Sequence, residues 1–435
     1  MAHQTQPNPP AVRTPKIVQG VRFAVGRRSA MRDWIGRHGR IFEINVPFFG
    51  RSVVVSDPHL VRSVCAAGPG QLDLIRPNLG NWFGPGSIFG MEGERHLERR
   101  RLLTPALHGQ WVTEYERVIE DETLREIANW PEGQEFRTLP SMNRITLTVI
   151  LRAVLGAEGS DLDRLREIIP PYMRLGQLLA FVPRPRFRTT LRYPRGRLDQ
   201  LRTEFDRIVD SLIVRATTDP AGERTDVLAR FLRSGPDGVG IPPSDLHDEL
   251  MTLVCAGHET TAAALAWTFE RLRRHPDVLA DLIREVDSGG EELRRATIME
   301  TLRARPVIDV LGRRVDSANF DLGGWRIPRD RMVIVRIADL HTNPDVYPHP
   351  ERFDPYRFLG ARPGAPTWLP FGAGVRRCVG AGFALTEMDI VVRTVLRHYR
   401  IQTDTVPGEK SHFRGVAHTP KCGGRIVVSR RSRPA

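Results

Sequence analysis

The sequence predicts a mainly α-helical protein with small β-sheets, on the basis of three observations. Residues 112–215 and 245–274 carry long apolar and polar patterns with helical spacing. Residues 381–398 form a further apolar segment of helical length, directly after a glycine-rich loop. Alternation of apolar and polar residues, which is typical of strands, is confined to short stretches such as 41–55.

The composition is that of a protein with a sizeable core. Of 435 residues, 40% are hydrophobic and 26% are charged, and the length alone would suggest about two or three domains. Residues 1–30 contain no apolar run of the length that a signal peptide or a membrane anchor needs, so we expect neither. Four widely spaced cysteines give no disulfide framework and indicate a reducing cytoplasm. They are Cys65, Cys255, Cys378 and Cys422.

The net charge of +13 comes almost wholly from arginine. Such a bias can reflect the base composition of the gene, and it can equally form a basic face that attracts acidic partners. A nucleic acid would be one such partner, but no recognition motif or interleaved aromatic pattern supports it. We expect no nucleic-acid binding and keep it only as a remote alternative, through the basic tail at residues 430–433.

The chain begins with a polar, proline-rich arm, residues 1–15, that we expect to be disordered. Residues 41–55 predict an antiparallel hairpin, and residues 69–93 predict a long irregular loop because they lack periodicity. The helical pattern that follows is broken near Pro170–Pro171 and across residues 182–194. Beyond it we expect a linker, two short strands and an irregular proline-rich segment, at residues 235–243, 323–328, 332–337 and 343–355.

One cysteine stands in a loop suited to a large flat ligand. Residues 371–380 deliver Cys378 to the N-terminus of the helix predicted over 381–398. The helix dipole and two adjacent arginines favour a thiolate there, and three glycines leave room for close approach. A thiolate with no second ligand nearby suits an axial bond to haem iron better than a zinc site. The arginines are Arg376 and Arg377, and the glycines are Gly372, Gly374 and Gly380.

The pattern Phe371-x-x-Gly374-x-Arg376-x-Cys378-x-Gly380 resembles the haem-thiolate loop of the cytochrome P-450 monooxygenases. The resemblance implies the cytochrome P-450 fold, as one large domain over residues 16–430 followed by a basic tail at 431–435. It also implies haem b, ligated by the Cys378 thiolate and contacted by Phe371, Gly372 and Gly380. In the family fold, the break at residues 182–194 would be a lid between two helices.

The predicted helix over residues 245–274 contains Ala256-Gly257-His258-Glu259-Thr260. A glycine inside a helix costs about 1 kcal/mol relative to alanine, so it should have a purpose. A threonine hydroxyl bonded to a backbone carbonyl opens a helix locally, and the small residues would leave room for a diatomic ligand. The segment resembles the family's Ala-Gly-x-acid-Thr motif beside the haem. That implies that Ala256 contacts the cofactor, Thr260 hydrogen-bonds bound oxygen and Glu259 relays protons.

Two other interpretations of this segment exist. Thr260 alone could be an ordinary helix threonine whose hydroxyl is satisfied by its own backbone. Cys255 and His258 could be a metal pair, but a structural zinc site needs four ligands and the sequence offers no partner pair. We therefore expect His258 to be a surface residue or a neighbour of the site.

His96 and Arg100 lie four residues apart and share one face of a predicted helix. They resemble the family's His-x-x-x-Arg clamp for the haem propionates, and by the same resemblance Arg376 and Arg313 would be further propionate ligands. The alternative is a solvated basic face, because two more arginines flank the motif.

Glu300 and Arg303 stand one helical turn apart, where a bidentate pair can form. They resemble the family's Glu-x-x-Arg pair, and Arg357 would be its third member. The resemblance assigns these residues a structural role beneath the cysteine loop.

Hydrophobic residues of the loops are candidates for the substrate pocket, although loop aromatics that pack on their own core would look the same. The candidates are Trp82, Phe83, Ile88, Phe89, Leu178 and Val416.

The resemblance implies a cytoplasmic, bacterial haem-thiolate monooxygenase that inserts one oxygen atom of O2 into a hydrophobic small organic substrate. Ferredoxin and ferredoxin reductase would supply the electrons. The first alternative is a haem-thiolate peroxygenase or an oxidative-coupling enzyme. A remote alternative is a non-enzymatic protein that binds haem or nucleic acid.

Overall fold

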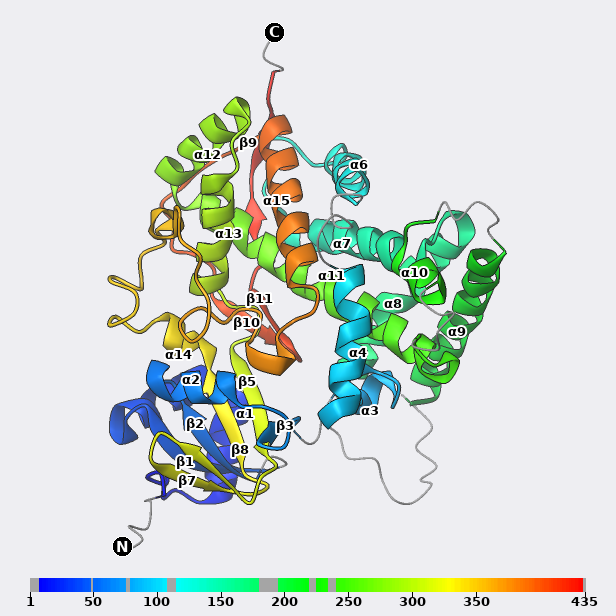
Figure 1. Ribbon diagram of the computed structural model, residues 1–435. Coiled ribbons are helices and arrows are strands. Elements are labelled where there is room, and N and C mark those ends of the chain that lie inside the picture. The colour runs from blue at the N-terminus through cyan, green and yellow to red at the C-terminus, as the bar shows by residue number, and fades with distance from the viewer. Residues whose placement is uncertain are drawn as a thin grey trace, which may run out of the picture.

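A 31-residue helix, α11 (Pro243–Arg273), crosses the middle of the molecule, and the other helices pack around it (Figure 1). The computed structural model describes residues 8–47, 50–75, 79–107, 115–179, 195–218, 224–233 and 240–432. Over these residues the chain is mainly helical and forms a single domain, as expected. The other helices are α1 (Lys16–His38), α2 (Pro58–Ala66), α3 (Gly80–Phe83), α4 (Gly93–Ala106), α6 (Glu116–Ile127), α7 (Thr138–Leu155), α8 (Gly159–Leu179), α9 (Arg195–Thr217), α10 (Val227–Arg233), α12 (Pro276–Ser288), α13 (Glu292–Ala304), α14 (Ile337–His341) and α15 (Ala381–His398).

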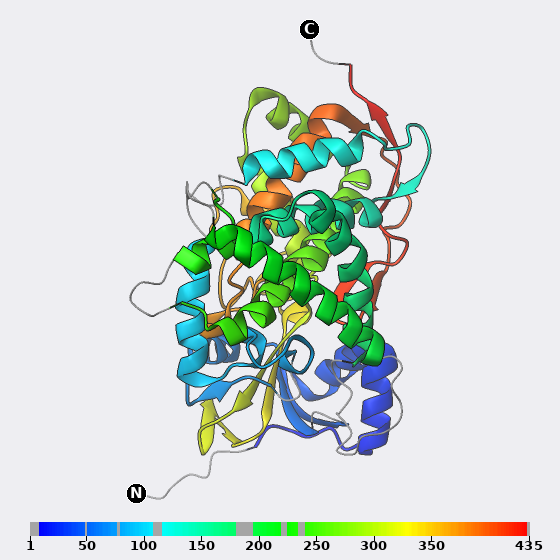
Figure 2. The ribbon, with the colours of Figure 1, turned by 90° about the vertical axis from the view of Figure 1, so that its right-hand side faces the viewer.

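The described strands form one five-stranded sheet, in the order β1-β2-β8-β5-β3, and several two-stranded sheets. The predicted hairpin is confirmed as β1 (Ile41–Val46) and β2 (Gly50–Val55), and β8 (Met332–Arg336) extends it in parallel. This sheet lies at the end of the molecule where the chain begins (Figure 2). The other strands are β3 (Leu72–Asp73), β4 (Phe136–Arg137), β5 (Val310–Val315), β6 (Asn319–Leu322), β7 (Trp325–Pro328), β9 (Tyr399–Ile401), β10 (Ser411–Arg414), β11 (Ala417–Pro420), β12 (Arg425–Ile426) and β13 (Val428–Arg430).

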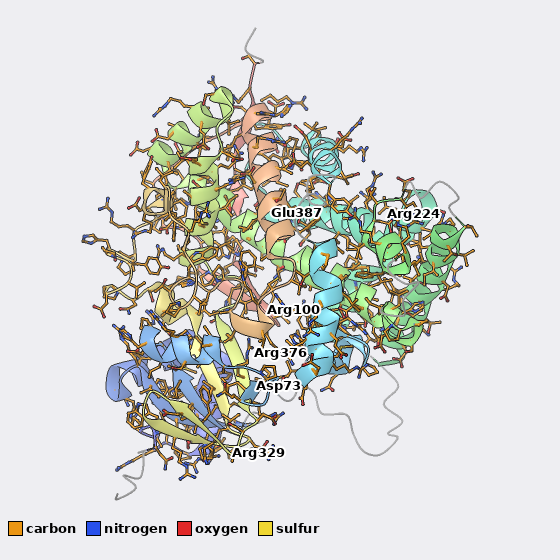
Figure 3. The ribbon with its side chains drawn as sticks, viewed as in Figure 1. Asp73, Arg100, Arg224, Arg329, Arg376 and Glu387 are labelled. Atoms are coloured by element: carbon orange, nitrogen blue, oxygen red, sulfur yellow. The ribbon has the colours of Figure 1, made fainter. Side chains whose placement is uncertain are left out.

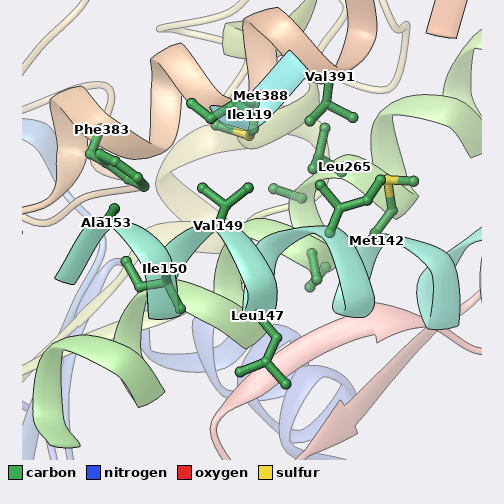
Figure 4. Close-up of a cluster of buried hydrophobic side chains, with 14 of the residues drawn as sticks. Ile119, Met142, Leu147, Val149, Ile150, Ala153, Leu265, Phe383, Met388 and Val391 are labelled. Atoms are coloured by element: carbon green, nitrogen blue, oxygen red, sulfur yellow. The ribbon is translucent and has the colours of Figure 1, made fainter. Parts of the chain in front are cut away.

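The main apolar core lies where α7, α11 and α15 meet (Figure 4). Val149 of α7, Leu265 of α11 and Met388 of α15 are each at most 1% exposed, and Ile119 of α6 packs against them. Burial of each such side chain stabilises the fold by about 1.5–3 kcal/mol. The core therefore fixes α11 relative to α15, which begins directly after the cysteine loop.

The break predicted near Pro170–Pro171 is wrong, because α8 continues through both prolines. Each proline removes one backbone N–H donor and its helical hydrogen bond. Ile168, Ile169 and Tyr172 are at most 2% exposed, so burial of this part of the helix offsets the lost bonds. The other predicted break, residues 182–194, lies outside the described residues, as does most of the predicted linker at 235–243.

The loop predicted over residues 69–93 contains three short elements: β3, α3 and the 3₁₀ turn Ile88–Gly90. Side chains from α11 hold it, because Asp248 accepts the Gly86 N–H at 2.9 Å and Glu249 accepts the Ile88 N–H at 3.0 Å. Elements of this length produce no periodic pattern, so the sequence does not reveal them.

The predicted disordered arm, residues 1–15, is too long. Residues 1–7 lie outside the description, but residues 10–12 pair with β1. The Val12 N–H donates to the Glu43 carbonyl oxygen at 2.9 Å, and the Glu43 N–H donates to that of Pro10 at 2.8 Å. Val12 is also buried beside Trp34, so apolar packing orders this segment. No helix in the described part of the chain is both long and apolar enough to cross a membrane.

Candidate active site

The loop that carries Cys378 is closed by its own backbone. The Cys378 N–H donates to the carbonyl oxygen of Phe371 at 2.9 Å, directly before α15. Gly374 has a φ of +66°, and a Cβ there would lie 2.4 Å from the carbonyl oxygen of Cys65, so the position requires glycine. Gly380 is different, because a Cβ there would meet no described atom within 4 Å. Open space therefore lies beside the N-terminus of α15.

The side chain of Cys378 is accessible to water, yet burial raises the pKa of its thiol. The two observations agree for a side chain that faces a hollow within the protein. The Gly380 N–H, Arg100 and Arg377 lower the pKa, but desolvation outweighs them. The lowered pKa predicted from the sequence is thus wrong for the protein by itself, and a metal ion would have to displace the thiol proton.

Arg376, which the sequence placed among the groups acting on the thiol, has another partner. Its Nη2 donates to Asp73 Oδ1 and to the carbonyl oxygen of Met91, both at 2.6 Å. Figure 3 shows it with Arg100 and Asp73 in the region between α4 and the large sheet. Because Asp73 compensates its charge, Arg376 is a fixed part of the loop support.

Arg100 and Arg313 are cations without an anionic partner among the residues that the structure describes. Arg100 donates to the carbonyl oxygen of Arg377. Arg313 is 9% exposed, and within the described part of the chain its hydrogen bonds go to the carbonyl oxygens of Gly312 and Ala373, at 2.9 and 3.4 Å. Burial lowers its pKa to about 10. A buried guanidinium without a carboxylate favours binding of an anion. This donor set fits the two carboxylates of a haem.

His96 lies within the field of the same arginines. Burial, followed by the charges of Arg376 and Arg100, lowers the pKa of its imidazole to about 4. His96 is therefore neutral at pH 7 and would serve a propionate as an N–H donor rather than as a cation. Its neighbour Arg99 is not part of a solvated face, because it is 4% exposed and pairs with Glu249 at 2.8 Å.

The middle of α11 keeps accessible surface within an otherwise buried stretch. Between residues 250 and 272, only Ala256, Gly257, Glu259 and Thr260 are not fully buried. The Thr260 hydroxyl donates to the Ala256 carbonyl oxygen at 2.8 Å, as expected, but α11 remains a continuous helix. Gly257 has a packing reason, since a Cβ there would lie 2.9 Å from Ile150 of α7. The accessible side chains fit a ligand space beside α11.

Glu259 and its neighbour His258 have different surroundings. Gln177 of α8 donates a hydrogen bond to Glu259 Oε2, yet burial raises the pKa of the Glu259 carboxyl. His258 is 5% exposed, and its Nδ1 lies 3.1 Å from the Thr146 hydroxyl, at a cavity of about 550 Å³ between α6, α7 and α8. Burial lowers the His258 pKa to about 4, so this histidine is neutral and is not at the surface.

The Glu300–Arg303 pair is completely buried. Arg303 Nε and Nη2 donate to the two carboxylate oxygens of Glu300 at 2.6 and 2.7 Å, and Arg357 Nε lies 3.5 Å from Oε2. Arg303 also donates to the carbonyl oxygens of His341 and Pro350 at 2.9 Å. The pair thus ties α13 to the irregular segment that precedes the cysteine loop.

The pocket candidates separate into two groups. Phe83 and Ile88 are 2% and 7% exposed and pack in the main core. Trp82 stacks on Phe83 at 4.3 Å, and Phe89 is half-buried. Val416 is half-buried in the β10–β11 turn. The side chain of Leu178 lies outside the description.

Comparison with known proteins decides the family. The family model described as cytochrome P450 matches residues 9–423, nearly the whole chain. The chain belongs to the cytochrome P-450 family. It is therefore a haem-thiolate monooxygenase, with iron protoporphyrin IX as cofactor, and the non-enzymatic alternative falls away. The accessible cysteine, the unpaired guanidinium groups and the accessible face of α11 fit that cofactor.

Similar cytochromes P-450 come from mycobacteria. The chain is 53% identical to a putative cytochrome P-450 138 of Mycobacterium tuberculosis over 425 residues, covering 97% of this chain and 96% of that protein. It is 36% identical to a putative cytochrome P-450 135B1 of the same species, covering 90% and 85%.

Solved structures support the fold. A retinoic-acid-bound cyanobacterial CYP120A1 matches with a TM-score of 0.82 at 22% identity, covering 98% of this chain and all of that one. A cytochrome P-450DA haem domain matches with a TM-score of 0.83 at 20% identity, covering 99% of each chain.

Two residues that the sequence analysis did not single out take part in the site. Asp73 holds Arg376, and Gln177 holds Glu259. They lie far from their partners in sequence and belong to no motif, so only the tertiary structure reveals them.

Proposed function

We propose that this cytochrome P-450 hydroxylates or epoxidises a hydrophobic small organic molecule, with Glu259 and Thr260 as its proton-handling pair. The observation that carries the proposal is that both residues lie on the stretch of α11 that keeps accessible surface within the core. Burial raises the pKa of Glu259, so the carboxyl retains its proton to higher pH than an exposed glutamate.

When bound, haem supplies the chemistry that activates O2. The Cys378 thiolate would bind the haem iron, and Arg100, Arg313 and Arg376, with neutral His96, would hold the propionates. Glu259 would pass its proton through water towards Thr260. While the Thr260 hydroxyl donates to Ala256, its lone pairs can still accept a hydrogen bond from that water.

Thr260→Ala and Glu259→Gln test this assignment. Each should lower product formation by about 10²-fold, because general-acid assistance is lost, while O2 is still consumed and appears as hydrogen peroxide. Thr268→Ala is the matched control, since Thr268 lies on the same helix and its hydroxyl also donates to the carbonyl four residues earlier, at 3.0 Å. Full coupling of product to O2 in both site variants would overturn the roles of Glu259 and Thr260.

We propose an acidic ferredoxin, reduced by its reductase, as the electron donor. The net charge of +13 and the exposed Arg377, adjacent to Cys378, support this partner. Arg376 is bound to Asp73 and is less suited to docking than Arg377.

Peroxygenation and oxidative coupling are the alternative chemistries. The acid–alcohol pair favours oxygen insertion from O2, because it serves proton delivery. Comparing turnover driven by peroxide with turnover driven by ferredoxin distinguishes a peroxygenase from an O2-dependent monooxygenase. Faster turnover with peroxide alone would favour the peroxygenase.

A further inference from the structure

Gln177, close to the end of α8, contacts both the proposed proton donor and the β10–β11 turn. Its Nε2 donates to Glu259 Oε2. Its Cβ and Oε1 each lie 3.0 Å from the position that a Cβ on Gly415 would occupy, and Gly415 has a φ of +65°. The turn therefore needs glycine, both for its backbone conformation and for its close approach to Gln177.

The Gln177 amide is the group that can orient the Glu259 carboxyl. Two charged or titratable groups face the Glu259 carboxyl. One is Arg414 of β10, whose charge lowers the pKa of Glu259. The other is Cys255 of α11, whose own thiol has a raised pKa. Neither donates a hydrogen bond to it. Among the residues that the structure describes, Gln177 is the hydrogen-bond donor to the carboxyl.

We propose that Gln177 is the positioning residue for the proton donor, and that it couples the orientation of Glu259 to the positions of α8 and the β10–β11 turn. The inference rests on the proposed role of Glu259. An amide N–H that donates to Oε2 favours the carbonyl form of that oxygen, so the proton of the neutral carboxyl sits on Oε1.

The coupling matters because the same side chain contacts the turn that carries Val416, a candidate pocket residue. A substrate that displaced this turn or α8 would change the hydrogen bond to Glu259 at the same time. Gln177 thus links occupancy of the pocket with the orientation of the Glu259 carboxyl.

Infrared titration of the purified holoenzyme tests the inference without measuring activity. The C=O band of the protonated carboxyl is assigned to Glu259 by its loss in Glu259→Gln. The Gln177 amide stabilises the ionised form of Glu259, so Gln177→Leu should raise the midpoint of the Glu259 titration by about one to two pH units. Gln177→Lys adds a cation and should lower it.

Gln402→Leu is the matched control, because Gln402 is an exposed glutamine after β9 and should leave the midpoint unchanged. An unchanged midpoint in both Gln177 variants, or an equal shift in the control, would overturn the inference. The reduced, carbon-monoxide-bound spectrum of each variant verifies that it is folded and loaded.

Failure of this inference differs from failure of the proposed function. If Glu259→Gln forms as much product per O2 consumed as the wild type does, the proposed role of Glu259 is wrong. If Glu259→Gln forms less product per O2 consumed but the Gln177 variants leave the Glu259 titration midpoint unchanged, only the positioning role of Gln177 is wrong.

Discussion

Glu300, Arg303 and Arg357 form a buried group of charges, and removing one of them should strongly lower the stability of the fold. Arg303→Ala leaves the Glu300 carboxylate buried with Arg357 as the remaining cation among the described residues, so the free energy of unfolding should fall by about 3–5 kcal/mol. Denaturation in urea and the haem content of the purified variant measure the effect. Arg295→Ala is the control, because Arg295 lies on the same helix as Arg303 and forms an exposed pair with Glu291, the residue before that helix. A loss below about 1 kcal/mol for Arg303→Ala would contradict the structural role.

Gly374 is the residue on which the loop backbone depends. Gly374→Ala forces a left-handed conformation on a side-chain-bearing residue and places its Cβ against the Cys65 carbonyl. Stability should fall by about 1–3 kcal/mol, with reduced haem content. Gly364→Ala serves as the control, since a Cβ there meets nothing within 4 Å and φ is not positive. Equal thermal midpoints for the two variants would show that the loop tolerates a side chain.

At the residue scale, the sequence locates groups that belong to local motifs. Glu300 and Arg303 stand one turn apart, so their pairing follows from helix geometry. The partnership of Arg376 with Asp73 joins positions 303 residues apart and leaves no local trace. The pKa of Cys378 could not be predicted for the same reason: the sequence shows the nearby arginines, but desolvation depends on tertiary packing.

At the scale of elements, α4 and α11 are joined by a buried pair that is sensitive to pH. Glu249 is completely buried and binds Arg99, yet burial raises its pKa from 4.5 to about 7. The folded protein therefore favours the protonated carboxyl. The stability from this group is complete below the unfolded-state pKa, about 4.5, and is lost as the pH rises through about 7.

Glu249→Gln removes this titration. The free energy of unfolding of the wild type, relative to the variant, should fall by about 3 kcal/mol as the pH rises from about 4.5 to above 7. Urea denaturation of both proteins at a series of pH values measures the difference. Parallel curves would show that Arg99 compensates the charge fully.

Element prediction from sequence succeeds where burial and periodicity agree. α11 and α15 are long, apolar and uninterrupted, and the predicted residues 245–274 and 381–398 match them. α8 was predicted to break at its prolines because the sequence does not show that this part of the helix is buried in the core.

At the scale of the whole molecule, the net charge of +13 predicts a salt-dependent partnership with an acidic ferredoxin. Arg377→Glu should raise the KM for ferredoxin by about tenfold, because a rim charge beside Cys378 is reversed, with little change in substrate affinity. Arg329→Glu is the matched control, because Arg329 is equally a surface arginine but lies at the far end of the large sheet (Figure 3). Equal KM values for the two variants would place the docking surface elsewhere.

The overall architecture follows from the sequence only through the spacing of its motifs. Length alone suggested two or three domains, whereas one core joins α7, α11 and α15 across more than two hundred residues. Contacts of this range set the domain count, and composition does not encode them.

The central claim is that Cys378 is the haem ligand, and the most direct test is the absorption spectrum of the reduced, carbon-monoxide-bound protein. The wild type should show the red-shifted Soret band of a thiolate ligand, and Cys422→Ser should keep it. Cys378→Ser should lose the band while remaining folded. A red-shifted band that persists in Cys378→Ser, or a wild type without it, would contradict this account.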